Sequence, residues 1–170
     1  MPTKARLSTG LAYKSTNVLD DVNIRLLAEL QADPRITMSA LARRVGMSAP
    51  AVTERVQRLE QAGVITGYTV QVDPAALGYP VTVFVRVRIT TGRLDRFSAY
   101  VATVPEVVEG YRITGEDCYL LKVHIPTLDD LAELLDRFLL HGSTTSSVVV
   151  GTPVPARPLP LPGDEIERVG

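Results

Sequence analysis

The stretch RRVGMSAPAVTERVQRLEQAG, residues 43–63, carries the clearest structural pattern in the chain. Its second part has apolar residues at intervals of four and three, at Val52, Val56 and Leu59. This spacing predicts a helix with one apolar face. Ser48 is a typical helix N-cap, and Pro50 suits the first turn, where its missing N–H needs no partner. Gly46 can take the left-handed conformation that ends a helix, so we expect two helices joined by a tight turn.

Two further patterns precede this stretch. LDDVNIRLLAEL predicts a helix with Asp20 as its N-cap and with an apolar stripe of Ile24, Leu27 and Leu30. TMSALARRVG predicts a helix that starts near Thr37 or Ser39, ends at Gly46 and turns Leu41, Ala42 and Val45 inward. Residues 64–73 are expected to form a β segment. Three short helices, with about four residues between the second and the third, match a helix-turn-helix, and the predicted fold class of this unit is the winged form.

A helix-turn-helix places its last helix in the major groove of DNA, with cations against the phosphates. The residues expected to contact DNA are Arg43, Arg44, Ser48, Ala49, Pro50, Thr53, Glu54, Arg55, Gln57 and Arg58. Thr53 and Gln57 can reach base edges, whereas arginines at the helix ends more often bind the backbone. Glu54 either accepts from a cytosine amino group or pairs with Arg58. On the pattern alone, a helical hairpin with a solvated charged face is the alternative.

Residues 80–152 have a different spacing of apolar residues. VTVFVRVRI, residues 81–89, alternates strictly, with valines and Ile89 on one face and Phe84, Arg86 and Arg88 on the other. The remaining elements are expected to be a helix at about 93–103, strands near 106–114 and 117–125, a helix at 127–140 with six apolar residues on one stripe, and a last strand in TTSSVVVG. The order βαββαβ is ferredoxin-like, so the predicted fold class is α+β. A helix-free sheet face is commonly buried against a partner; the alternative is that the two arginines are only solvated.

Composition and charge limit the class of protein. The hydrophobic fraction of 45% and charged fraction of 22% are those of a globular protein. Residues 1–72 carry nine Lys and Arg against six Asp and Glu, and residues 73–170 carry nine against thirteen, so the first half is basic and suits a polyanion. One cysteine, no apolar run of about 18 residues and no apolar leader core favour a cytoplasmic location.

The outer segments complete the expected domain organisation. Residues 1–17 are expected to form a flexible basic arm, residues 18–66 the DNA-binding domain and residues 67–79 a linker strand and turn. Residues 153–170 are Pro-rich and are expected to form an extended tail. His124, His141 and Cys118 lack the spacing of a zinc site, and no motif for catalysis is present, so we expect neither a metal nor a catalytic residue.

The loop in ITGEDCYLLKV contains groups that could bind a zwitterion such as an amino acid. Gly115 permits an unusual backbone conformation, and the amides freed by such a turn can donate to a carboxylate. Glu116 or Asp117 can bind an ammonium group. From spacing alone, a plain hairpin turn that carries acidic residues without a ligand remains the alternative.

The chain from LDDVNIRLLAEL through VGMSAPAVTERVQRLEQAGVITGY to DPAALG resembles the leucine-responsive regulatory protein/AsnC family of bacterial transcription regulators. The resemblance continues to about residue 152, and one departure is Asn23, where the family usually has aspartate. It implies a homodimer with sheets packed face to face, assembly into octamers, binding to double-stranded DNA and an amino-acid effector. No other cofactor and no membrane are implied.

The resemblance also implies an effector site at the family's glycine-aspartate-x-aspartate-tyrosine signature. By position, Gly115 and Tyr119 match, Glu116 replaces the first aspartate, and Cys118 replaces the second, which leaves Asp117 as a substitute. The expected effector-binding residues are Thr114, Gly115, Glu116, Asp117, Cys118, Tyr119, Thr144, Thr145, Ser146 and Ser147.

Two other functions fit the same scaffold. An effector-independent protein that wraps and organises DNA is favoured by the cysteine at position 118. A sirohaem-decarboxylase-like enzyme would need groups to bind and protonate a tetrapyrrole, and neither histidine lies in the loop expected for that task.

Overall fold

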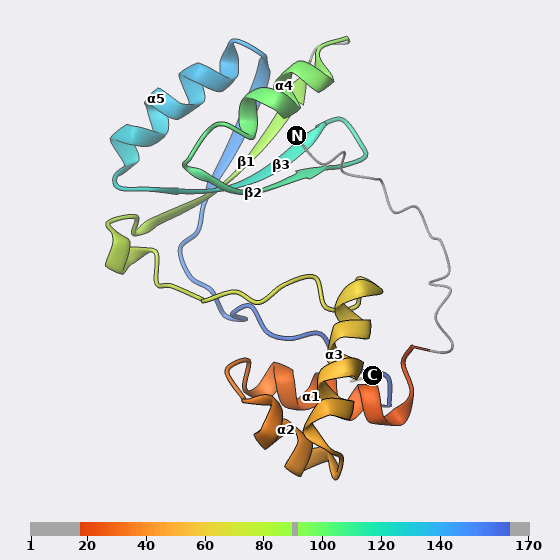
Figure 1. Ribbon diagram of the computed structural model, residues 1–170. Coiled ribbons are helices and arrows are strands. Elements are labelled where there is room, and N and C mark those ends of the chain that lie inside the picture. The colour runs from red at the N-terminus through yellow and green to blue at the C-terminus, as the bar shows by residue number, and fades with distance from the viewer. Residues whose placement is uncertain (1–17, 90–91, 164–170) are drawn as a thin grey trace, which may run out of the picture. The chain divides into compact units, whose positions relative to one another are not determined.

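The computed structural model describes residues 18–89 and 92–163, and these residues form two compact units (Figure 1). The first unit ends at Thr69 and takes in the chain again from Ala156, whereas the second unit spans Val70–Pro155. The expected basic arm lies outside the described residues. Each unit has its own core of buried apolar side chains.

The first unit contains three helices, α1 Asp21–Ala32, α2 Met38–Val45 and α3 Ala49–Gln61. The predicted N-cap of α1 is confirmed, because Asp20 Oδ1 accepts a hydrogen bond of 2.7 Å from the amide of Asn23. The predicted stripe is partly wrong: Leu26 is fully buried, whereas Ile24 and Leu27 are only half-buried. A helix turns every 3.6 residues, so a stripe at constant intervals of three drifts away from the core.

The second helix begins and ends where the sequence predicts. Thr37 caps α2 by accepting a hydrogen bond of 3.2 Å from the amide of Ala40. Gly46 ends the helix with φ of 72°, in the left-handed region that favours glycine, and donates its amide to the Ala42 carbonyl. Leu41, Ala42 and Val45 are buried as expected, so α2 packs inward while its arginines remain exposed.

The expected β segment at residues 64–73 is not a strand in the structure. The amides of Val64 and Ile65 donate to the Leu59 carbonyl at 2.9 and 3.2 Å, and the chain beyond them is extended without ladder partners. Val70 has 83% of its surface exposed. Alternation of side chains can predict an extended chain, but a strand also needs a neighbouring backbone edge, and no described strand supplies one.

The Pro-rich tail is extended, as predicted, over the part that the structure describes. Residues 153–163 form neither helix nor strand. From Ala156 they belong to the first unit, where the Gln31 side-chain amide donates to the Leu159 carbonyl at 3.4 Å. The described part of the tail therefore lies against α1 of the first unit.

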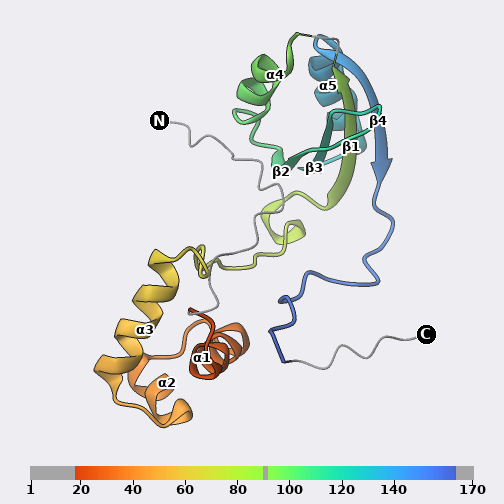
Figure 2. The same ribbon diagram turned by 90° about the vertical axis from the view of Figure 1, so that its right-hand side faces the viewer.

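The second unit begins with a 3₁₀ turn, Ala75–Leu77, and then has the predicted βαββαβ order. Its elements are β1 Val81–Ile89, α4 Leu94–Val101, β2 Val107–Arg112, β3 Tyr119–Ile125, α5 Leu128–Leu139 and β4 Gly142–Val148. The strands form one antiparallel sheet in the order β2-β3-β1-β4, which puts β1 in the interior between β3 and β4. Figures 1 and 2 show α4 and α5 on the same side of this sheet, so its other face carries no helix.

The alternation predicted for β1 is confirmed. Val83, Val85 and Val87 are fully buried beneath the helices, and the residues between them are exposed on the helix-free face. From α5, Leu134 and Phe138 are buried in this core. Leu128 and Leu139, the outer members of the predicted α5 stripe, are exposed. They lie in the first and last turns of the helix, which extend past the apolar cluster beneath it.

Gly142, the first residue of β4, is required by close backbone packing. A Cβ atom at this position would lie 2.0 Å from the carbonyl oxygen of Arg88. We predict that Gly142→Ala lowers the free energy of unfolding by about 1–3 kcal/mol, because β1 is paired on both sides and cannot move away. Urea unfolding measures this. Gly151→Ala is the matched control, since nothing lies within 4 Å of its Cβ position. Equal stability of the two variants would contradict the assignment.

Candidate nucleic-acid interface and effector loop

Helix α3 has one face in the core and one face in solvent. Val52, Val56 and Leu59 are buried, as the sequence predicts, and Val52 and Val56 pack into the apolar cluster formed with α1 and α2. The exposed members of the predicted DNA-contact set are Arg43, Arg44, Ser48, Pro50, Glu54, Gln57 and Arg58. Ala49, Thr53 and Arg55 are only partly exposed and lie on the flanks of the helix. The outward face of α3 is therefore narrower than the sequence suggests.

Two hydroxyl groups differ from their expected roles. Ser48 stands at the N-cap with an extended backbone, but its side chain makes no capping hydrogen bond. Its exposed hydroxyl remains available to a ligand. Thr53 donates its hydroxyl to the Ala49 carbonyl at 2.9 Å, within the helix. This bond satisfies the Thr53 donor locally and leaves only the oxygen lone pairs for a base edge.

The exposed arginines of this region differ in their ion pairs. Arg44 pairs with Glu29 of α1 at 2.6 Å, and Arg58 pairs with Glu54 of α3 at 2.5 Å. Arg43 is exposed and makes no ion pair with any described residue. It is thus the cation most directly available to a phosphate.

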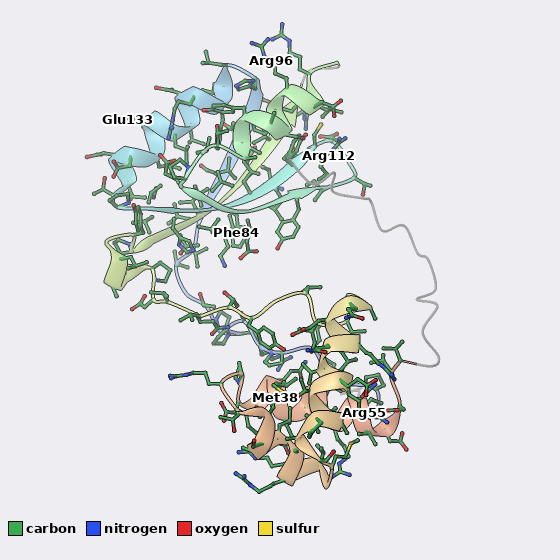
Figure 3. All side chains as sticks on the ribbon, viewed as in Figure 1. Met38, Arg55, Phe84, Arg96, Arg112 and Glu133 are labelled. Carbon is green, nitrogen blue, oxygen red and sulfur yellow. The ribbon has the colours of Figure 1, made fainter. Side chains whose placement is uncertain are left out.

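Arg55 points toward α1 rather than outward, which corrects the expectation that it is an exposed cation. Its guanidinium donates to Asp20 Oδ2 at 2.7 Å and to Asn23 Oδ1 at 3.0 Å, and 29% of its side chain is exposed (Figure 3). Asn23 is buried and donates to the Val18 carbonyl at 2.7 Å. Arg55 therefore fixes α3 to the N-terminus of α1. The Asn23 departure matters here, because its amide oxygen accepts from Arg55 while its nitrogen donates elsewhere.

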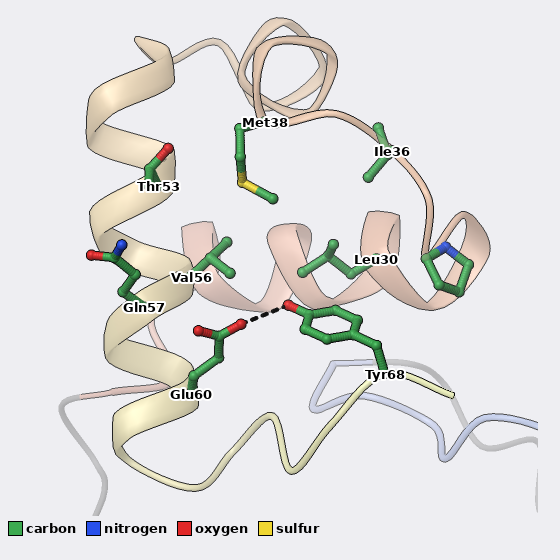
Figure 4. A pocket seen from close by; sticks show the side chains of 9 residues that line it. Leu30, Ile36, Met38, Thr53, Val56, Gln57, Glu60 and Tyr68 are labelled. Carbon is green, nitrogen blue, oxygen red and sulfur yellow. Dashed lines mark hydrogen bonds between the residues drawn. The ribbon is translucent and has the colours of Figure 1, made fainter. Parts of the chain in front are cut away.

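An open groove of about 360 Å³ runs along α3 in the first unit, and no pattern in the sequence predicts it. Its lining is Leu30, Pro34, Ile36, Met38, Thr53, Val56, Gln57, Glu60 and Tyr68 (Figure 4). Tyr68, from the segment expected to be a strand, donates its hydroxyl to Glu60 at 3.0 Å. Burial and the neighbouring Glu60 carboxylate raise the pKa of Tyr68, so the phenol stays protonated and keeps this bond. This hydrogen bond holds the start of the linker against α3.

The loop predicted to bind the effector connects β2 and β3 and is closed by backbone hydrogen bonds. The amide of Ile113 donates to Cys118 O at 3.1 Å, and the amide of Cys118 donates to Val87 O at 2.9 Å. Between them, the amides of residues 114–117 donate to no described protein atom. Gly115 has φ of 113°, which favours glycine. The loop thus exposes four consecutive donors.

The acidic residues of the loop are already paired with arginines of β1. Arg88 donates to Glu116 at 2.5 Å, and Asp117 lies 3.8 Å from both Arg86 and Arg88. The interpretation of Arg86 and Arg88 as merely solvated is therefore wrong. Sequence spacing could not reveal these pairs, because they depend on how β3 sits beside β1.

Cys118 and Tyr119 turn toward the core. Cys118 packs against the apolar cluster, and Tyr119 has only 3% of its surface exposed. The Tyr119 hydroxyl lies 2.6 Å from Ser98 Oγ and donates to Leu94 O at 2.8 Å, while Arg112 lies 5.6 Å from its ring centroid. Tyr119 thus supports the loop from beneath.

The hydroxyl residues of β4 divide between the two faces of the sheet. Thr145 pairs with Arg86 and Ser147 with Phe84, so both lie on the helix-free face. Thr144 and Ser146 pair with buried valines of β1 and lie on the other face. Because β1 separates β4 from β3, the structure does not bring these four residues into the β2–β3 loop.

The described ranges contain neither a metal-binding cluster nor a membrane-spanning helix. Residues 18–89 and 92–163 contain no group of three or more His, Cys, Asp or Glu side chains that could hold a metal ion. Over the same ranges, no helix is long and apolar enough to cross a membrane.

Comparison with known proteins assigns both units. Residues 19–66 match the winged helix-turn-helix DNA-binding family, and residues 82–159 match the Lrp/AsnC ligand binding domain. The chain is 34% identical over 131 residues to the HTH-type transcriptional regulator LrpC of Bacillus subtilis (strain 168), covering 77% of this chain and 91% of LrpC. It is 38% identical over 133 residues to the leucine-responsive regulatory protein of Rhizobium meliloti (strain 1021), covering 76% and 83%.

Solved structures agree with this assignment. The structure of B. subtilis LrpC matches with a TM-score of 0.75 and covers 79% of this chain and 96% of that chain. The complex of a transcriptional regulator from Neisseria meningitidis with L-Met matches with a TM-score of 0.76 and 30% identity, covering 84% and 96%. The two units define a DNA-binding transcriptional regulator with a ligand-binding domain, and not an enzyme. The chain belongs to the Lrp/AsnC family.

The contact between α3 and α1 is testable through pH. Arg55 and the Asn23 amide lower the pKa of Asp20 from its ordinary value of 3.8. The stabilisation is therefore present above 3.8 and is lost as the pH falls through the lowered pKa. We predict a coupling of about 0.2–1 kcal/mol between Asp20→Asn and Arg55→Gln at neutral pH, because the pair is partly exposed, and a smaller coupling at about pH 2.5.

Urea unfolding of both single variants and the double variant at each pH measures this coupling. Arg43→Gln is the control, since Arg43 has no ion-pair partner among the described residues and its loss should leave stability nearly unchanged. A coupling that does not change with pH would exclude the Asp20 carboxylate as its source.

Proposed function

We propose that this Lrp/AsnC regulator responds to an amino acid bound at the loop of residues 114–117. The observation that carries the proposal is the run of four consecutive backbone amides with no acceptor among the described residues, at a turn where Gly115 has φ of 113°. Such a run suits a carboxylate, because several N–H dipoles converge on one anion. The structural neighbour bound to L-Met supports an effector of this class.

The ammonium group of the effector requires an acidic partner. Asp117 is the better candidate, because it lies 3.8 Å from two arginines, beyond direct hydrogen-bonding distance, and retains acceptor capacity. Glu116 is more exposed and is held closely by Arg88. In this proposal Cys118 and Tyr119 shape the loop, whereas Thr114, Gly115, Glu116 and Asp117 surround the effector. Thr145 and Ser147 contribute only if the effector extends over the helix-free face.

A thermal-shift titration against the common amino acids tests this site. One amino acid is expected to raise the unfolding temperature in a saturable way, with about 2.7 kcal/mol of stabilisation at a concentration one hundred times its Kd. Gly115→Asp should abolish the response, because it strains the turn and places a carboxylate against the effector's own. Gly78→Asp is the matched control, since Gly78 also has a positive φ, of 87°, and an open Cβ position. A wild-type protein that responds to no amino acid contradicts the proposal.

We propose that α3 enters the major groove of double-stranded DNA. Arg43, Arg44 and Ser48 would bind phosphates, and Pro50, Gln57 and their outward neighbours would approach the bases. Ala49 and Thr53 lie at the edge of this contact. Arg55 sets the angle of α3 relative to α1 through its bonds to Asp20 and Asn23. Because the target is chromosomal DNA, we place the protein in the cytoplasm, at the nucleoid.

We further propose a homodimer formed through the helix-free face of the sheet, with dimers assembling into an octamer. Phe84 is 37% exposed on this face, and Figure 3 shows it on the side of the sheet away from α4 and α5. The charges around it are paired: Lys122 with Glu109 at 3.0 Å, in addition to the arginines with the loop acids. Paired charges can be buried at an interface at a lower cost than isolated ones. A dimer would space two recognition helices by about 34 Å, one turn of DNA.

The dimer proposal predicts that Phe84→Asp dissociates the protein. A carboxylate at the centre of the interface should weaken association by at least about 30-fold, the effect of losing a central contact. Sedimentation velocity over a concentration series measures this. Leu140→Asp is the control, because Leu140 is exposed at the end of α5 and lies on the opposite side of the sheet. Unchanged sedimentation of the Phe84 variant would refute this interface.

One observation favours a second function, that of an effector-independent DNA-organising protein. The loop acids are neutralised by arginines of the same chain, and Cys118 packs into the core where the family usually has aspartate. A loop that satisfies its own charges has less need of a ligand. The titration described above separates the two functions.

A further inference from the structure

The outward face of α3 carries an acidic residue, Glu54, at a position that a polyanion would approach. A carboxylate facing phosphates is unfavourable unless it accepts a hydrogen bond from the DNA or is neutralised. Glu54 is exposed over 63% of its side chain, on the side of the helix opposite Val52 and Val56. Its presence therefore requires an explanation beyond folding.

The partner of Glu54 is Arg58, four residues further along the helix. Arg58 Nη2 lies 2.5 Å from Glu54 Oε1, and 69% of the Arg58 side chain is exposed. Exposed pairs at this spacing contribute little to stability. Glu54 Oε2 and the other guanidinium donors of Arg58 make no hydrogen bond to a described residue, so both groups can bind a ligand while they stay paired.

The other arginine of α3 is committed to the interior of the unit. Arg55 is bonded to Asp20 and Asn23, so Arg58 is the guanidinium that α3 keeps on its outward face. A carboxylate and a guanidinium fixed side by side form a pattern of one acceptor group next to a fork of donors. This pattern can be compared with the edges of the four base pairs.

A C·G base pair complements that pattern in the major groove. Cytosine presents an amino donor, and guanine presents two adjacent acceptors, O6 and N7, that suit a guanidinium fork. In an A·T pair the acceptors lie on either side of the adenine amino group, so the fork has no adjacent pair to bind. We propose that Glu54 and Arg58 act as one reading unit that selects a C·G base pair in each half-site, with Glu54 on cytosine and Arg58 on guanine.

This inference rests on the proposed placement of α3 in the major groove, and selection from a randomised duplex library tests both. Wild-type protein should enrich a motif with a fixed C·G pair in each half-site. Glu54→Gln should lose that preference and admit A·T, because glutamine binds adenine through N6 and N7. The preference for C·G over A·T at that position, measured by competition, should fall by about 5- to 150-fold.

Arg43→Gln is the matched control, because Arg43 is an exposed cation off α3 and should bind phosphate alone. It should weaken binding to all sequences equally and keep the motif. If Glu54→Gln enriches the wild-type motif, or if it only strengthens binding to every sequence, the reading unit is refuted while DNA binding by α3 stands. If wild-type protein enriches no motif, the proposed placement of α3 fails as well. Circular dichroism of each variant verifies that the helices remain folded.

Discussion

The segregation of apolar side chains onto one face of each element governs both units. In the second unit this constraint acts through β1, whose valines are buried beneath α4 and α5 while Phe84 and the arginines occupy the opposite face. Both helices use one side of the sheet, so the other side is left without cover. In the first unit the same rule acts on α3, where a narrow buried stripe leaves the opposite face of the helix in solvent. The two proposed binding surfaces are therefore the faces that the two apolar cores leave uncovered.

Sequence reasoning succeeded where periodicity alone decides structure. The three helices, their turn at Gly46 and the βαββαβ order follow from local spacing and from residues with special backbone preferences. It failed for residues 64–73, because alternation predicts an extended chain but not the neighbour that a strand needs. It also misplaced the stripe of α1, where Leu26 rather than Ile24 is buried, since a short apolar run permits more than one face.

The contacts of the candidate site residues could not be predicted from the sequence. Arg43, Arg55 and Arg58 look equivalent in the sequence, yet one makes no described ion pair, one binds α1 and one pairs along its own helix. Their roles depend on whether a carboxylate from another element lies within reach. The same holds for Asp117, which meets arginines from a strand about thirty residues earlier, and for Tyr119, whose hydroxyl finds its partner in α4. Contacts between distant segments therefore separate residues that local patterns group together.

The strand order carries a consequence for how the second unit is made. Strand β1 is synthesised first, but its two neighbours are β3 and β4, and β4 is completed only at Val148. Until then, one edge of an apolar strand has no backbone partner, and pairings so distant in sequence form slowly. A nascent chain stopped anywhere before Gly142 would present that edge to its neighbours. Premature termination between Ile89 and Gly142 should therefore yield an aggregating fragment rather than a shorter, partly active regulator.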